Sequence, residues 1–198
     1  MNVNRFRQLL IELTILLRNV NAPILEILNP GIRRVDAEKI LGYLSLPEEV
    51  FVLYEWKNGS LIDRQRLLGE NWLFKRGIFM LAERAVELYT KKAGKDGFWN
   101  KAMFPLFESR GGDFYLIDSD VHSPTYRMIF FHSIGAVDYD TMISKYDSLE
   151  TLFETILECF KTRIYHYDPS SKTLEFDPMP ERNLSKKYNP KAGYWKLV

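Results

Sequence analysis

The chain has 198 residues, of which 46% are hydrophobic and 14% aromatic, and its formal net charge is +1. This composition excludes a disordered or low-complexity protein, and the length suits one substantial hydrophobic core. A charge so close to zero gives the molecule as a whole no field that would attract nucleic acid or an acidic substrate. The single cysteine, Cys159, excludes an intramolecular disulfide and fits a reducing compartment.

The first predicted element is an amphipathic helix. Apolar residues recur at helical spacing from Val3 to Val20, and Glu12 interrupts a run that otherwise resembles a signal peptide. No apolar stretch of the sequence reaches the ~18 residues of a membrane span. We therefore predict a cytoplasmic protein in which residues 1–26 form a helical extension before the main domain.

Two further helices are predicted before residue 60. After a Pro-Gly break, Asp36 is expected to cap a short helix in the segment AEKILGYL. The next segment, LPEEVFVLYEWKNGS (46–60), predicts a nearly all-apolar helix that begins at Pro47 and is closed by Gly59. Proline suits the first helical position, and glycine adopts the left-handed conformation that closes many helices.

The middle of the chain is predicted to form an antiparallel sheet. WLFKRGIFML (72–81) is rich in strand-favouring residues with a bend near Gly77, and a helix follows in LAERAVELYTKKA. FPLFESRGGDFYLIDSD places two aromatic runs on either side of a Gly-Gly turn, which is typical of a β-hairpin. TYRMIFFHS is the third strand candidate, with Tyr126, Met128 and Phe130 on one face.

One more helix, a strand pair and an irregular tail complete the chain. Asp147 and Glu150 make a capping-box pattern at the start of a helix from Leu149 to Lys161. RIYHYDPSSKTLEFDP then predicts two short strands. The last 18 residues carry five basic residues and one acidic residue, and we favour a solvated tail over contact with an acidic partner. The prediction is an α+β fold, a single domain with a central antiparallel sheet flanked by N-terminal and C-terminal helices.

Three segments, in order, carry a family resemblance. The first is NPGIRRVDAEKILGYLSLPEEVFVLYEWKNGS, where a short helix precedes LP, two acidic residues and a second helix ending in Asn-Gly. The others are FPLFESRGGDFYLIDSD and DSLETLFETILECF. Together, over residues 27–165, they resemble the SUKH superfamily, which includes fungal cell-wall regulators of the Smi/Knr type and many bacterial toxin-immunity proteins.

The resemblance implies a function as well as a fold. It implies a SUKH-like α+β domain over residues 27–165 that binds other proteins and is not an enzyme, followed by a strand pair and basic tail at 166–198. Bacterial members often neutralise a toxin encoded beside them, so an immunity protein is the expected function and a regulatory scaffold is the alternative. The near-neutral charge argues against a nuclease as the toxin, because a nucleic-acid mimic needs a strongly negative surface.

An enzyme is the less favoured hypothesis. Asp113, Asp118 and Asp120 are carboxylates of the kind that bind magnesium, which would suit a carboxylate-metal hydrolase. Alternation along a strand places Asp118 and Asp120 on one face and Asp113 on the other. The sequence contains no P-loop, no dinucleotide fingerprint and no ligand pair among its histidines. No catalytic residue, cofactor or metal is therefore expected.

The predicted partner contact combines the Gly-rich hairpin with the end of the helix that begins at Pro47. Loops on a rigid sheet present charge and aromatic side chains at little ordering cost. KKYNPKAGYWK interleaves basic and aromatic residues as single-strand binders do, but no basic sheet accompanies it, so a protein partner is expected in preference to nucleic acid or a membrane. The protein itself is expected to be a monomer or a weak homodimer. The predicted protein-binding residues are Trp56, which also suits a core, and Asn58, Glu108, Arg110, Asp113, Tyr115 and Asp118.

Overall fold

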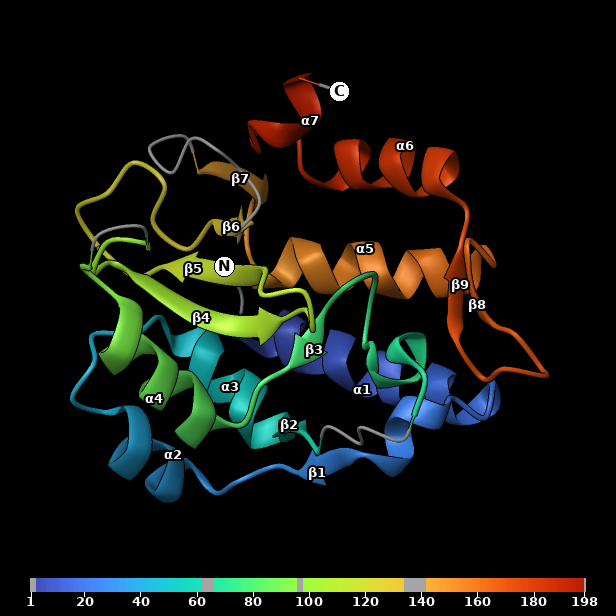
Figure 1. The fold of residues 1–198 in the computed structure, drawn as a ribbon, viewed down its shortest axis with the longest axis horizontal. Coiled ribbons are helices and arrows are strands. Elements are labelled where there is room, and N and C mark those ends of the chain that lie inside the picture. Colours follow the sequence, from blue (N-terminus) through green and yellow to red (C-terminus); the bar gives the residue numbers. More distant parts are fainter. Residues whose placement is uncertain (1–2, 62–65, 96–97, 134–141, 198) are drawn as a thin grey trace.

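The central feature of the molecule is a five-stranded antiparallel sheet. The computed structural model describes residues 3–61, 66–95, 98–133 and 142–197 (Figure 1). The strand order is β3-β4-β5-β6-β7. The predicted α+β class with a central antiparallel sheet is confirmed. The strands are β3 (Ile78–Phe79), β4 (Met103–Glu108), β5 (Phe114–Asp118), β6 (Ile129–His132) and β7 (Ile143–Tyr146).

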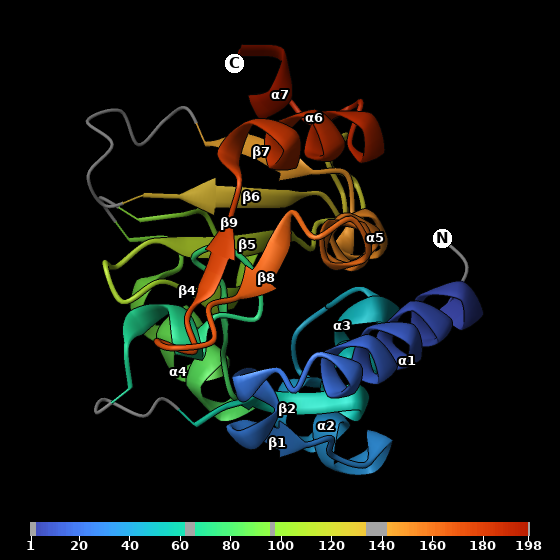
Figure 2. The same ribbon diagram turned by 90° about the vertical axis from the view of Figure 1, so that its right-hand side faces the viewer.

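Helices pack around this sheet, and Phe153 of α5 contacts both the sheet and α1. The Phe153 ring of α5 lies 6.5 Å from the Phe107 ring of β4 and 5.5 Å from the Phe6 ring of α1. Figure 2 shows α5 beside the sheet, with α1 and α3 below it. The helices are α1 (Val3–Asn19), α2 (Arg34–Leu41), α3 (Glu48–Trp56), α4 (Ala82–Lys92), α5 (Leu149–Lys161), α6 (Pro178–Tyr188) and α7 (Tyr194–Leu197), with short 3-10 helices η1 (Pro23–Glu26) and η2 (Leu68–Asn71).

Helix α1 is packed into the same core as the sheet. Its apolar stripe is buried and belongs to one continuous hydrophobic cluster with residues of α3, α5 and the strands. The predicted amphipathic helix is therefore present, and in the structure it forms part of the domain's interior. None of the described helices combines the length and apolar character needed to cross a membrane.

The segment after α3 differs from the sequence-based prediction. The helix ends at Trp56, and the chain continues directly into β2 (Lys57–Ser60), which pairs with β1 (Leu28–Pro30). Gly59 does take the left-handed conformation, with φ +68°, but it does so within β2 and does not close the helix. A Cβ at Gly59 would lie 2.3 Å from the Leu81 backbone nitrogen, so close packing against the start of α4 requires glycine here.

Two predicted helix caps were also wrong. Helix α2 begins earlier than expected, and Asp36 lies in its first turn, where it pairs with Arg33 at 2.7 Å. Helix α5 has the predicted bounds, but its N-cap is Ser148. The Ser148 hydroxyl accepts a bond from the Thr151 N–H at 3.1 Å, and the Thr151 hydroxyl accepts one from the Ser148 N–H at 3.0 Å.

The sheet and the C-terminal region show both agreement and error. The hairpin β4–β5 and the strand pair β8 (Tyr165–Tyr167) and β9 (Leu174–Phe176) are confirmed. Tyr126 and Met128 lie in the loop before β6, so they do not share a strand face with Phe130. The tail expected to be irregular forms α6 and α7, because Asp177 caps α6 and Trp195 is buried.

Candidate functional site

Three of the predicted binding residues lie together at the turn between β4 and β5. Arg110 is exposed there, and Asp113 is half-buried, with its carboxylate accepting hydrogen bonds from Ser109 Oγ at 3.1 Å and Ser133 Oγ at 2.8 Å. Glu108 is also half-buried, and burial raises the pKa of its carboxyl while the nearby Arg84 opposes the rise. The turn is thus held by its own side chains and presents Arg110 to solvent.

Trp56 and Asn58, predicted to join that turn in a partner contact, have internal partners. The Trp56 indole N–H donates to Thr14 Oγ1 at 2.8 Å, and its ring lies 5.9 Å from that of Phe153. Asn58 is 8% exposed, and its Oδ1 accepts a bond from the Ala82 N–H at 3.0 Å. Asn58 therefore satisfies the first orphan donor of α4, and Trp56 connects α3 to α1.

Tyr115 belongs to a buried polar cluster that the sequence did not reveal. It is 1% exposed, and its hydroxyl donates to the Lys75 carbonyl oxygen at 3.1 Å. The Lys145 ammonium donates to the same hydroxyl at 3.3 Å and lies 4.6 Å from the centre of the Phe131 ring and 5.4 Å from that of Tyr194. Burial lowers the pKa of Lys145 to about 8, although the nearby Glu181 opposes the change. Tyr115 thus holds the sheet interior together and offers no exposed surface to a partner.

Asp118 is the anchor of the loop that joins β5 to β6. It is 1% exposed, and its carboxylate accepts hydrogen bonds from the Asp120 N–H at 3.0 Å and from Thr125 Oγ1 at 2.7 Å. The Ser119 hydroxyl fixes the beginning of the same loop by donating to the Ala102 carbonyl oxygen at 2.6 Å. Residues 119–127 are therefore ordered by internal hydrogen bonds, with Asp118 at their root.

We expect Asp118→Asn to destabilise this loop and to lower the free energy of unfolding by about 2 kcal/mol. The substitution replaces a buried, charged hydrogen-bond acceptor by an amide. The amide NH₂ then faces either the Asp120 N–H or the Thr125 hydroxyl, so one of these two donors loses its acceptor. Chemical denaturation and amide exchange of residues 119–127 measure the effect. Asp120→Asn is the matched control, because the Asp120 side chain is exposed and accepts a local hydrogen bond from the His122 N–H at 2.9 Å. Equal behaviour of the two variants would contradict the anchoring role.

The ordered loop forms one wall of a cleft with a volume of about 660 Å³. Residues 43–46, after α2, contribute the facing wall, and Tyr89 of α4 also lines it. Two side chains of the lining are highly exposed, Tyr43 at 67% and Val121 at 66%. Lys101 and Asp120 add one charge of each sign. We call this the loop cleft. The sequence carried no signal for it, because exposure of these side chains depends on how distant segments meet.

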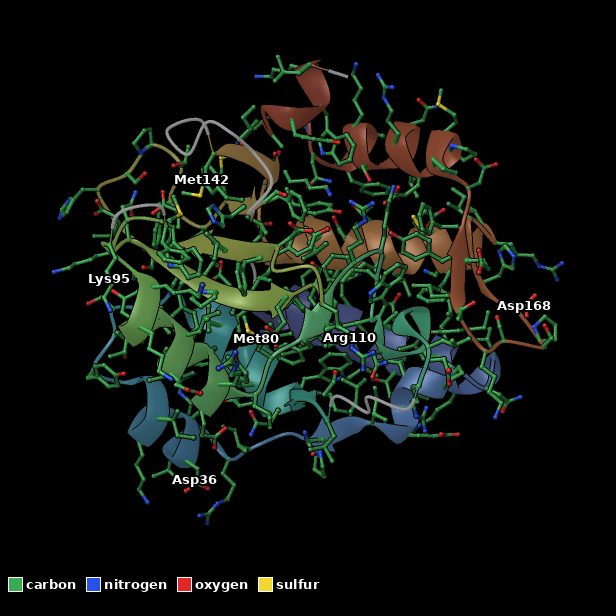
Figure 3. The ribbon with its side chains drawn as sticks, in the orientation of Figure 1. Asp36, Met80, Lys95, Arg110, Met142 and Asp168 are labelled. Carbon is green, nitrogen blue, oxygen red and sulfur yellow. The ribbon has the colours of Figure 1, made fainter. Side chains whose placement is uncertain are left out.

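The loop cleft and the hairpin turn lie at opposite ends of β4 and β5. The register pairs Met103 with Asp118 beside the cleft and Glu108 with Phe114 beside the turn. A second cleft of about 480 Å³ shares Ala102 and Asp120 with the loop cleft and is also lined by Met142. Figure 3 shows Arg110 beside the head of the β4 arrow and Met142 towards the other end of the sheet. The seven predicted residues therefore do not converge on one surface.

The three aspartates considered for a metal do not converge either. Asp113 precedes β5 and Asp118 ends it, so the strand separates them. Within the described ranges, no group of three His, Cys, Asp or Glu side chains is placed to hold a metal ion. Burial raises the pKa of the Cys159 thiol to about 12, with smaller contributions from Glu181 and Glu158. That thiol is fully protonated near neutral pH and packs as a small apolar side chain.

One end of the sheet thus carries a partly apolar cleft, with one wall held by hydrogen bonds to the buried Asp118. Its chemistry suits recognition of a protruding segment by packing and by a few polar contacts. No family model matches the sequence, and no curated protein matches it.

Proposed function

We propose that this protein is a non-catalytic protein-binding domain that acts as an immunity protein and holds a cognate toxin inactive. One observation carries the binding role, namely a cleft in which hydrogen bonds to the buried Asp118 hold one wall and whose lining exposes Tyr43 and Val121. The similarity of residues 27–165 to the SUKH superfamily supports the class of partner. The proposed contact surface is the loop cleft.

The physical argument for a protein partner is pre-organisation. Aromatic side chains are frequent anchors at protein interfaces, because they bury a large area at small entropic cost. Tyr43 stands exposed on one wall, and Val121 on the wall that Asp118 anchors. Docking a protruding partner segment between them buries apolar surface without ordering a loop, so little binding free energy is lost.

Inhibition follows from occupancy of this surface. A partner segment seated in the loop cleft packs on Tyr43 and Val121, while Lys101 and Asp120 orient its polar groups. The protein surface around the loop cleft then covers the active site of the toxin. No reaction is required of this chain, because a stoichiometric complex is sufficient to block the toxin.

The test is co-expression with the protein encoded by the neighbouring gene. We expect this chain to protect the cells and to co-elute with the neighbour on gel filtration. A double variant, Tyr43→Ser with Val121→Ser, should weaken the complex at least about 30-fold, the effect of losing an interface anchor worth about 2 kcal/mol. The matched control is Ile11→Ser with Val35→Ser, which removes two apolar side chains that are 58% and 47% exposed on α1 and α2, outside the cleft lining.

The possible outcomes of this test distinguish the immunity role from its alternatives. Equal cell death with and without this protein, together with no complex, would overturn the immunity proposal. A complex without protection would favour the regulatory scaffold, the alternative role within the same superfamily. Loss of the complex in Arg110→Ser, with the cleft variant unaffected, would move the contact to the hairpin turn.

A further inference from the structure

The C-terminal segment presents a basic surface that the proposed function does not use. In α6, the inward-facing residues Glu181 and Ser185 are 3% and 0% exposed. The opposite side of the helix and the residues that follow it are basic, and four of the five side chains are exposed while Arg182 is half-buried. We call this the C-terminal basic surface. Its residues are Arg182, Lys186, Lys187, Lys191 and Lys196.

The one acidic side chain in the described part of the segment does not compensate this charge at the surface. Glu181 is its single acidic residue, and it is buried, accepting bonds from Lys75 Nζ at 2.8 Å and the Tyr165 hydroxyl at 3.1 Å. None of the five basic side chains forms an ion pair with another described residue, whereas Arg34 and Lys91 elsewhere on the surface do. The positive potential of the segment is therefore directed outward.

The segment is held firmly against the rest of the protein. The Asn189 amide donates to Thr155 Oγ1 at 3.1 Å, and its Oδ1 accepts a bond from the Asp147 N–H at 3.0 Å. The Trp195 indole N–H donates to the Lys145 carbonyl oxygen at 2.6 Å. Figures 1 and 2 show α6 and α7 on one side of the molecule, over α5 and β7. The basic side chains therefore project from a fixed backbone, which reduces the entropy lost on binding.

We infer that the C-terminal basic surface docks an acidic protein surface. The inference rests on the proposed function only in taking the partner to be a protein. A fixed cluster of unpaired cations attracts a complementary acidic patch, speeds its encounter and sets its orientation. The surface shares no residue with the lining of the loop cleft, so it would give the same partner a second point of contact.

Nucleic acid fits this surface less well. Trp195 is 4% exposed, and Tyr188 and Tyr194 are half-buried, so the described part of the segment offers no fully exposed aromatic ring on which a base could stack. The last 18 residues hold five of the 27 basic residues and one of the 26 acidic residues, so the remainder of the chain is net negative. A long polyanion that extended beyond the segment would be repelled by that remainder.

The experiment removes the charge of four exposed lysines by replacing each with glutamine in the 198-residue chain. They are Lys186, Lys187, Lys191 and Lys196. The matched control replaces four exposed cations elsewhere by glutamine, namely Arg18, Lys95, Arg163 and Lys172. We expect the first variant to bind the neighbouring gene's product about tenfold more weakly than the parent at low ionic strength. Its binding affinity should also depend less steeply on salt concentration. The control variant should bind like the parent. Circular dichroism melting checks that both variants remain folded.

The outcomes separate this inference from the proposed function. Equal binding by both variants overturns the inference and leaves the immunity proposal standing. If the neighbouring gene's product binds neither the variants nor the parent, the immunity proposal fails. The C-terminal basic surface is then tested with three probes, namely poly-L-glutamate, poly-uridine RNA and phosphatidylserine vesicles. Preferential binding of poly-L-glutamate that the first variant alone loses supports the inference. Preference for RNA or vesicles, or binding to none of the three, overturns it.

Discussion

Replacing Glu49 by glutamine is expected to lower the free energy of unfolding by about 3 kcal/mol, because it leaves a largely buried guanidinium without its counter-charge. The Glu49 carboxylate accepts a hydrogen bond from Arg127 Nε, and the two side chains are 1% and 23% exposed. The expected loss is at the low end for buried pairs, since Arg127 keeps some contact with water. Arg127→Met should cost at least as much, because the Glu49 carboxylate is the more deeply buried partner.

A double-mutant cycle in urea measures this pair. The double variant, Glu49→Gln with Arg127→Met, should be more stable than the sum of the two single effects implies, because neither side chain is then left charged and alone. Glu87→Gln is the control, since Glu87 pairs with Arg84 and Lys91 on the exposed face of α4 and should leave the unfolding midpoint unchanged. Single variants as mild as this control would show that the pair contributes nothing.

The same pair connects a sequence motif to the loop cleft. Glu49 is the second acidic residue after Pro47, which itself follows the cleft wall at residues 43–46. Arg127 ends the opposing loop, where it holds a φ of +76°. The ion pair therefore fixes the two walls relative to one another. Glu49→Gln should weaken partner binding as well as lower stability.

Replacing Phe6 by alanine should lower the free energy of unfolding by about 3–5 kcal/mol, with a single cooperative transition retained. Phe6 is fully buried, and its ring meets that of Phe153 edge to face at 5.5 Å. The cavity would open where α1, α3, α5 and the sheet meet. Differential scanning calorimetry measures both the loss and the number of transitions.

The control for this prediction is on the same helix. Ile11 is 58% exposed, so Ile11→Ala changes helix propensity and little else, and its cost should stay below about 0.5 kcal/mol. If Phe6→Ala produced a separate early transition and left the main one unmoved, the helical extension that the sequence predicted would fold independently of the domain. One shifted transition would place α1 within the folding unit.

Sequence patterns predicted a secondary-structure element correctly where the residues that stabilise it all lie within one short segment. The apolar spacing of residues 149–161 predicted α5 with its observed bounds, and the Gly-Gly turn predicted the β4–β5 hairpin. The same is true of α4 and of the β8–β9 pair. In each case the periodicity or turn chemistry is complete within about 20 residues, so it needs no distant partner.

Strands β1 and β2 went unpredicted because each is three or four residues long and pairs with the other across two intervening helices. Strand β7 pairs with the preceding strand β6, but its four residues are too few to show an alternating pattern. The two caps failed for different reasons. Helix α2 begins at Arg34 without a side-chain cap, and at α5 the adjacent Ser148 takes the position expected for Asp147. Helix α6 was missed because its charged sequence shows no strong apolar stripe, while the burial of Glu181 against Lys75 decides its inner face.

For the candidate site, the sequence by itself determined the α+β class, the Gly-rich hairpin and the excess of basic residues at the C-terminus. Tertiary structure decided which polar residues face inward. Asn58, Tyr115 and Asp118 are of types that bind partners when exposed, yet each is buried with hydrogen bonds to a distant segment or loop. The loop cleft likewise exists only where residues 43–46 meet residues 119–127. The residue type gives the chemistry of a side chain. Its exposure and its hydrogen-bond partners depend on contacts between segments far apart in the chain, and these contacts exist only once the hydrophobic core has formed.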